Sequence, residues 1–241
     1  MKSTIHLSNK HGVQMIAHRG LSGIEPENTV AAFALAAEHS YFGIETDIHP
    51  TADGRYILIH DDSTGRVAAE NLPVTNTDFA TLRALKLKEC NGEISQRGLQ
   101  LSTLEEYLDI CRQAGKTAVL ELKNHIEKAD ISQICDRIRT YGYLEKVIFI
   151  SFDFAKLVAV REVLPNQPVQ FLTGRVDDEQ IACLKARRFD LDAEYHALNA
   201  ETVEKCHAAG IRVNCWTVDD PEAAAQLIQF GVDYITTNIL E

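Results

Sequence analysis

The sequence predicts an α/β fold, a (β/α)8 barrel, from two observations. Apolar runs rich in β-branched residues alternate with helical patterns along almost the whole 241-residue chain. Eight such strand segments are separated by seven helical ones. This alternation implies parallel strands that are joined by right-handed crossovers. A doubly wound open sheet would also satisfy the pattern, but eight units favour a closed barrel.

Each expected element follows from its local pattern. The strands are expected at residues 13–18, 43–49, 117–123, 146–152, 168–172, 190–194, 212–217 and 233–236. The helices are expected at residues 28–39, 103–114, 129–141, 154–163, 178–187, 201–209 and 221–230. Helix boundaries carry the usual signals: Ser102 or Thr103 and Asp220 are candidate N-caps, and Gly115 and Gly231 lie just past C-termini.

Two irregularities interrupt the repeat. Residues 50–101 are too long for an ordinary strand-to-helix loop, and within them residues 56–60 are expected to form a short strand. We interpret this segment as an insertion at the carboxyl end of the second strand, where barrel active sites form. Only residues 238–241 follow the last strand, so the eighth helix is expected to be missing or reduced to a turn. The sequence therefore predicts one domain, 1–241, with an insertion at about 50–101.

Composition excludes several classes of protein. Hydrophobic residues make up 45% and charged residues 24%, which is ordinary for a soluble globular protein. No apolar run approaches the ~20 residues of a membrane-spanning helix, and the first ten residues lack the apolar stretch of a signal peptide, so a cytoplasmic protein is expected. The net charge of −11 argues against a nucleic-acid partner. The six cysteines show no metal-ligand spacing and are expected to be mostly buried thiols.

Two carboxylates interrupt an apolar strand. Glu45 and Asp47 lie two residues apart in Ile-Glu-Thr-Asp-Ile, so their side chains should point the same way. Unpaired buried charges cost several kcal/mol, so stability alone does not explain them. Two converging oxygen donors suit a divalent cation such as Mg²⁺ or Ca²⁺.

The strand that begins at Thr117 repeats this spacing with Glu121 and Lys123. Glu121 would supply a third carboxylate to the cation. Lys123 would neutralise a bound anion or a developing oxyanion. The alternative is that both side chains lie on a solvated edge.

Two histidines flank these carboxylates. His18 ends the first strand and is followed by Arg19, whose guanidinium suits a phosphate. His60 precedes Asp61 at the end of the short strand and is a second candidate for proton transfer at neutral pH. Together these residues indicate a metal-dependent hydrolase.

The motifs resemble those of the glycerophosphodiester phosphodiesterase family over about residues 15–238. The similarity rests on the segments His18-Arg19-Gly20, Glu25-Pro26-Glu27-Asn28-Thr29, Glu45-x-Asp47, His60-Asp61, Glu121-Leu122-Lys123 and Trp216-Thr217-Val218. The combination is specific, because the motifs come in the family's order and at its spacings.

The resemblance implies a TIM barrel with a small insertion after the second strand. It also implies a divalent cation, Ca²⁺ or Mg²⁺, on Glu45, Asp47 and Glu121. His18 and His60 would be the general acid–base pair, with His18 as the base and His60 as the acid the favoured assignment. The substrate would be a small-molecule glycerophosphodiester, hydrolysed to sn-glycerol 3-phosphate and an alcohol.

The resemblance also implies substrate contacts. Arg19 and Lys123 would contact phosphate, and Trp216, at the end of a strand, would line the pocket for the glycerol or the alcohol. Asn28 would either touch the site or cap the first helix, and Thr29 could also be the cap.

The sequence departs from the family pattern in two places. After His60-Asp61 the chain keeps only Arg66 of an expected Arg-Thr-Thr, and Asn238 stands where the family favours Asp. Both changes leave open which alcohol is accepted. Two other readings remain: a phosphatidylinositol-type phospholipase C, and a non-catalytic homologue that binds a phosphorylated metabolite or a partner protein. The sequence does not indicate the oligomeric state.

Overall fold

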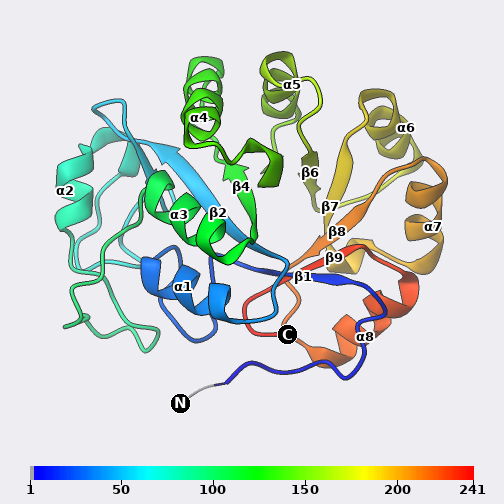
Figure 1. Cartoon of the computed structure of the whole chain (residues 1–241), viewed down its shortest axis with the longest axis horizontal. Coiled ribbons are helices and arrows are strands. Elements are labelled where there is room, and N and C mark those ends of the chain that lie inside the picture. Colours follow the sequence, from blue (N-terminus) through cyan, green and yellow to red (C-terminus); the bar gives the residue numbers. More distant parts are fainter. Residues whose placement is uncertain (1–2) are drawn as a thin grey trace.

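Eight parallel strands form a closed barrel in the computed structural model, which describes residues 3–241 (Figure 1). The barrel strands are β1 (Gln14–Ala17), β2 (Gly43–Pro50), β4 (Thr117–Leu122), β5 (Val147–Ser151), β6 (Val169–Thr173), β7 (Asp190–Glu194), β8 (Val213–Trp216) and β9 (Tyr234–Thr237). Each strand pairs with the next one in this order, and β1 pairs with both β2 and β9 to close the ring. The expected barrel is confirmed, and the open sheet is excluded.

Seven helices connect the barrel strands and surround them (Figure 1). They are α1 (Val30–Glu38), α3 (Leu104–Ala114), α4 (Lys128–Tyr141), α5 (Phe154–Val163), α6 (Asp178–Arg187), α7 (Ala200–Ala208) and α8 (Pro221–Phe230). Short 3₁₀ turns, η2 (Leu144–Lys146) and η3 (Tyr195–Ala197), lie beside β5 and β7. Thr103 caps α3 in a capping box with Glu106, and Asp220 caps α8, so of the two candidates Ser102 and Thr103 it is Thr103 that forms the cap.

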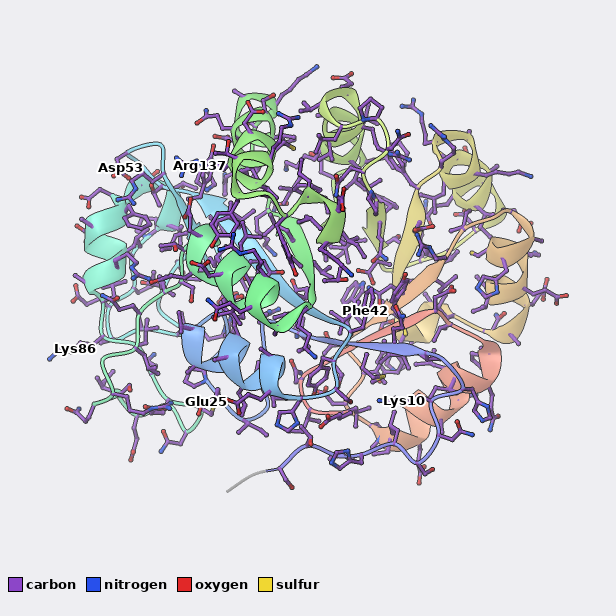
Figure 2. All side chains as sticks on the ribbon, viewed as in Figure 1. Lys10, Glu25, Phe42, Asp53, Lys86 and Arg137 are labelled. Atoms are coloured by element: carbon purple, nitrogen blue, oxygen red, sulfur yellow. The ribbon has the colours of Figure 1, made fainter. Side chains whose placement is uncertain are left out.

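The two faces of each strand have different environments. On β2, Ile44 and Ile48 pack into the large apolar core between the barrel and the helices. Glu45 and Asp47, at the alternate positions, therefore point into the barrel. A smaller apolar cluster occupies the barrel interior, and it comprises Ile16, Val119, Ile148, Ile150, Leu172 and Tyr234. Phe42 packs against this cluster and lies near the middle of the ring of strands in Figure 2.

The insertion is a small unit with a core of its own. It contains β3 (Tyr56–Leu58), η1 (Val74–Asn76) and α2 (Phe79–Ala84), and β3 pairs antiparallel with the end of β2. Its apolar cluster is Ile57, Ile59, Ala68, Val74, Phe79, Leu82, Leu85, Leu87 and Leu101. Figure 1 shows it at the left edge, and Asp53 and Lys86 are labelled there in Figure 2.

Extended chain replaces a helix after β9. No helix forms in residues 238–241, as expected; instead Leu240 is buried and pairs with Ile5 of the N-terminal segment. The Glu241 carboxylate accepts hydrogen bonds from Thr4 Oγ1 and from the backbone N–H of Ser40, at 2.9 and 2.7 Å. These contacts join the residues after β9 to the N-terminal segment and to the chain just after α1.

Two further expectations can be compared with the structure. Among residues 3–241, no helix is long and apolar enough to cross a bilayer. The thiols of Cys111, Cys135 and Cys206 are buried, and none of them forms a disulfide.

Tyr107 provides a test of how α3 supports the strands that carry the carboxylates. Its buried hydroxyl lies 2.7 Å from Ile44 O on β2 and 3.3 Å from Val119 O on β4. Tyr107→Phe should lower the free energy of unfolding by about 1 kcal/mol, because the buried hydrogen bond is lost. Urea denaturation measures this change. Tyr195→Phe is the control, since the Tyr195 hydroxyl has no hydrogen-bond partner among residues 3–241; an equal loss in both variants would contradict the assignment.

Candidate active site

The residues singled out in the sequence gather at the carboxyl ends of β1, β2, β4 and β8. The barrel strands are parallel, so these ends share one face of the barrel. His18 directly follows β1, Lys123 directly follows β4, and Trp216 ends β8. His60 comes from the chain just after β3, where the insertion leaves the barrel.

Three carboxylates converge inside the barrel mouth. Glu45, Asp47 and Glu121 each place one oxygen so that all three lie within 4.8 Å of one another. Asp47 on β2 is the register partner of Glu121 on β4, which accounts for their proximity. The three residues are 3%, 0% and 8% exposed, so water solvates them little.

The protonation of these carboxylates reflects their crowding. Burial, followed by the charge of Asp47, raises the pKa of Glu45 well above its ordinary value and that of Glu121 to about 7. Burial also acts to raise the pKa of Asp47, but the Arg19 and Lys123 cations outweigh it and hold this pKa well below its ordinary value. Asp47 is therefore the carboxylate that stays ionised most readily.

The donor set fits a hard divalent cation. It consists of carboxylate oxygens alone, which Mg²⁺ and Ca²⁺ prefer. Asp47 Oδ1 is buried and accepts no hydrogen bond, so one lone-pair donor of the cluster has no hydrogen-bond partner among residues 3–241. A buried acceptor without a hydrogen bond is costly; the Lys123 ammonium, 3.4 Å away, offsets part of this cost, and a bound cation would contact the oxygen directly.

Two cations lie against the cluster. Lys123 Nζ lies 2.9 Å from Glu121 Oε1 and 3.4 Å from Asp47 Oδ1. Arg19 Nε lies 3.6 Å from Asp47 Oδ2, and the Arg19 backbone N–H donates to Glu45 Oε2 at 2.8 Å. Burial acts to lower the pKa of Lys123, but the two carboxylates outweigh it and raise this pKa. Lys123 is therefore on the site and not on a solvated edge.

Asn28 also belongs to the site. Its Nδ2 donates to Asp47 Oδ2 at 2.9 Å, and its Oδ1 accepts from Thr46 Oγ1 at 2.7 Å. Thr29 is the N-cap of α1, where it accepts from the Ala32 N–H. Of the two roles that the sequence allowed for Asn28, the structure favours contact with the site.

His18 is hydrogen-bonded to a neutral amide. Its Nδ1 lies 2.8 Å from Asn238 Oδ1, at the position where the sequence departs from the family pattern. Burial, followed by the Arg19 charge, lowers the pKa of His18 from 6.5 to about 4. At neutral pH the His18 imidazole is therefore uncharged, with a proton on only one of its two nitrogens.

His60 lies in a network of charges instead. Its Nδ1 is 2.7 Å from Asp61 Oδ1, and Arg66 Nε donates to the other Asp61 oxygen at 2.7 Å. Arg66 also makes two hydrogen bonds to Glu27, at 2.5 and 2.9 Å, and Glu27 in turn pairs with Arg19 at 3.0 Å. Burial acts to raise the pKa of Asp61, but hydrogen bonds from Arg66 and His60 lower it to about 2. The network joins the insertion to the first barrel loop.

Trp216 lies at the rim of the barrel with an aromatic neighbour. Trp216 Nε1 donates to the Asp192 carbonyl at 3.2 Å, which fixes the indole over the interior cluster. The Phe152 ring meets it edge-on with centroids 5.5 Å apart. Phe152 itself is 48% exposed.

Comparisons with known proteins agree with this geometry. Residues 18–241 match the model of the glycerophosphoryl diester phosphodiesterase family. The chain belongs to this family. It is therefore a phosphoric diester hydrolase that acts on glycerophosphodiesters.

Individual relatives span almost the whole chain. A glycerophosphodiester phosphodiesterase of Caldanaerobacter subterraneus subsp. tengcongensis is 31% identical over 230 residues, which cover 93% of each protein. The solved structure of an Oleispira antarctica phosphodiesterase in complex with the product sn-glycerol-3-phosphate has a TM-score of 0.86 at 25% identity and covers 93% of this chain and 92% of that one. A glycerophosphodiester phosphodiesterase of Parabacteroides distasonis has a TM-score of 0.79 at 27% identity and covers 95% and 94%.

Some contacts around the candidate site are not indicated by the sequence. Phe152 directly follows β5 in the run Ser151-Phe152-Asp153, and only its place after a strand could have drawn attention to it. Asp219 contacts Asn238 from the loop between β8 and α8, and no local pattern marks it. The sequence marks Arg66 as a remnant of a family motif, but nothing in it indicates the pairing of Arg66 with Glu27.

The Arg66 network gives a test that is specific to this phosphodiesterase. Arg66→Met should reduce kcat by roughly 10- to 100-fold, because Asp61 would no longer hold the His60 ring in place. Arg97→Met is the matched control: Arg97 also joins two glutamates, Glu25 and Glu89, between the first loop and the insertion, and its side chain is 45% exposed against 46% for Arg66. Steady-state assays and thermal melts of both variants make the comparison. A similar fall in kcat for both would mean that the insertion is merely loosened.

Proposed function

We propose that this enzyme hydrolyses glycerophosphodiesters to sn-glycerol 3-phosphate and an alcohol, using one divalent cation and the pair His18 and His60. The observation that carries the proposal is the cluster of three buried carboxylates beside two histidines. One histidine is hydrogen-bonded to a neutral amide, Asn238, and the other to a carboxylate, Asp61. The bound product named for the Oleispira antarctica phosphodiesterase supports the choice of product.

Glu45, Asp47 and Glu121 would hold the cation, which is Mg²⁺ or Ca²⁺ by the chemistry of these donors. When bound, the cation supplies positive charge that offsets the charge on the non-bridging phosphate oxygens. Asn28 would keep Asp47 oriented through its 2.9 Å hydrogen bond, and the Arg19 N–H would do the same for Glu45.

Lys123 and Arg19 would bind the phosphate. Both cations now face carboxylates, so an incoming phosphodiester would share them with Asp47 and Glu121. The guanidinium of Arg19 can donate two parallel hydrogen bonds, whereas the ammonium of Lys123 acts as a point charge. These contacts would stabilise charge that grows on the phosphoryl oxygens in the transition state.

The environments of the two histidines support their roles. His18 would accept the proton of the nucleophile, which is water or the 2-hydroxyl of the substrate, because its low pKa keeps it unprotonated at neutral pH. His60 faces the ionised Asp61 with Nδ1, so that nitrogen carries a proton and Nε2 is directed elsewhere. To act as the acid, His60 would carry a second proton on Nε2 and give that proton to the departing alkoxide, while the Nδ1 proton stays hydrogen-bonded to Asp61.

Trp216 would pack against the glycerol or the alcohol, together with Phe152 at the same rim. An aromatic wall suits the apolar face of a glycerol backbone and leaves its hydroxyls free to hydrogen-bond.

The net charge of −11 argues against nucleic acid as a partner, and the cytoplasmic location stays a prediction.

The first test is release of glycerol 3-phosphate from glycerophosphocholine, glycerophosphoethanolamine and glycerophosphoglycerol. After EDTA treatment release should fall to background, and Mg²⁺ or Ca²⁺ should restore it, because the cation is needed at the phosphate. Asp47→Asn should lose both cation affinity, measured by calorimetry, and activity.

His18→Ala is the control for this assay, because it should lose activity while it keeps cation binding. Full activity in EDTA would contradict the proposal that hydrolysis needs a cation. Undiminished cation affinity in Asp47→Asn would contradict the ligand assignment.

The pH dependence of kcat/KM gives a second test. A base must be unprotonated to act, so the rate should rise with pH as His18 loses its proton, at about pH 4. It should fall again at high pH, when the acid has lost its proton. Rate profiles of His18→Ala and His60→Ala should each lack one limb, at a cost of about 10²–10⁴-fold in rate. A wild-type profile with a single limb would argue against a pair of histidines.

A further inference from the structure

The neighbours of Asn238 permit one orientation of its side-chain amide. Its Oδ1 lies 2.8 Å from His18 Nδ1 and 2.7 Å from Ser22 Oγ, and its Nδ2 lies 2.6 Å from Asp219 Oδ2. The oxygen and the nitrogen of an amide have almost the same shape, so partners decide which is which.

Ser22 does not decide the orientation. Its hydroxyl lies 2.7 Å from the His18 carbonyl as well as from the Asn238 amide. It could donate its single proton to that carbonyl and accept one from a reversed amide, so both orientations would satisfy it. The amide is therefore held from its other side.

Asp219 does decide it. Its Oδ1 accepts from the Asn238 backbone N–H at 2.8 Å and from Thr237 Oγ1 at 3.0 Å, which fixes the carboxylate in place. Its Oδ2 then meets the Asn238 side chain. A carboxylate only accepts, so the amide must present its NH₂ group to Asp219 and its oxygen to His18.

We propose that Asp219 is a positioning residue, which acts through Asn238 to keep the proton of His18 on Nδ1 and the lone pair on Nε2. An amide oxygen at Nδ1 can only accept, so Nδ1 must donate. A reversed amide would put its NH₂ group against Nδ1 and move the imidazole proton to Nε2, where the ring could no longer accept the proton of a nucleophile. The inference rests on the proposed role of His18 as the base.

Asparagine at this position has a consequence of its own. The charged groups that act most strongly on His18 are Arg19, Asp47 and Glu27, and Asn238 adds no charge to them. A carboxylate at position 238 would orient the ring equally well, but it would favour the imidazolium. Asn238 and Asp219 together therefore orient the base, while the Asn238 amide separates the negative charge of Asp219 from the His18 ring.

Asp219→Asn tests the proposal, because it should reverse the Asn238 amide. The new side chain would keep its oxygen on the Asn238 N–H and Thr237 Oγ1, and so turn its own NH₂ group toward Asn238. NMR of ¹⁵N-histidine-labelled protein at neutral pH distinguishes the two tautomers, with His18→Gln to assign the signal. We expect protonated Nδ1 in the wild type and protonated Nε2 in the variant, with kcat about 10²-fold lower or more and KM little changed.

Two further variants complete the experiment. The double exchange Asp219→Asn/Asn238→Asp should restore both the Nδ1 tautomer and activity, because a carboxylate at position 238 can only accept from the ring. Its acidic limb should lie at higher pH than that of the wild type, since the carboxylate favours the imidazolium. Asp220→Asn is the matched control: Asp220 is the next residue and caps α8, a role that Asn fills equally well, so tautomer and rate should not change.

Protonated Nε2 in the wild type, or an unchanged tautomer in Asp219→Asn, would overturn the proposal. The tautomer is read without substrate. An Asp219→Asn change in tautomer in a protein that hydrolyses no glycerophosphodiester would thus support the positioning role and refute the proposed function.

Discussion

Three carboxylates buried inside one end of a barrel are the constraint on which the rest of the site depends. Glu45, Asp47 and Glu121 are almost without solvent, and like charges at this spacing repel strongly. Arg19 and Lys123 supply part of the opposing charge from the ends of β1 and β4. Protonation relieves part of the repulsion, since the pKa values of Glu45 and Glu121 are raised, and a divalent cation would allow all three carboxylates to ionise.

The strand period links this site to the fold. On β2 the side chains alternate between the helices and the barrel interior, so Ile44 and Ile48 build the core while Glu45 and Asp47 build the site. Below the carboxylates, the smaller apolar cluster, which includes Ile16, Val119 and Tyr234, fills the barrel interior. A shift of one residue in the register of β2 would exchange the two sets, so the packing of the core enforces the geometry of the carboxylates.

The sequence was informative wherever the structure repeats a local pattern. The barrel strands and helices lie where their patterns predicted them, and the spacing of Glu45 and Asp47 was enough to predict that they converge. Contacts between distant loops were not predictable. Asp219 reaches His18 only through Asn238, and Arg66 meets Glu27 across the boundary of the insertion. Loop paths and side-chain rotamers bring these residues together, and neither can be read from a periodic sequence pattern. The choice of Thr103 over Ser102 as a cap likewise depended on backbone geometry.

The separate core of the insertion has an evolutionary consequence. Since β3, η1 and α2 pack around their own apolar cluster, substitutions in that cluster need not disturb the barrel. Two of its arginines, Arg66 and Arg97, form ion pairs with Glu27 and Glu25 of the first loop. The apolar cluster of the insertion can therefore diverge in sequence without displacing Glu45, Asp47 or Glu121, provided that the ion pairs of Arg66 and Arg97 with the first loop are kept.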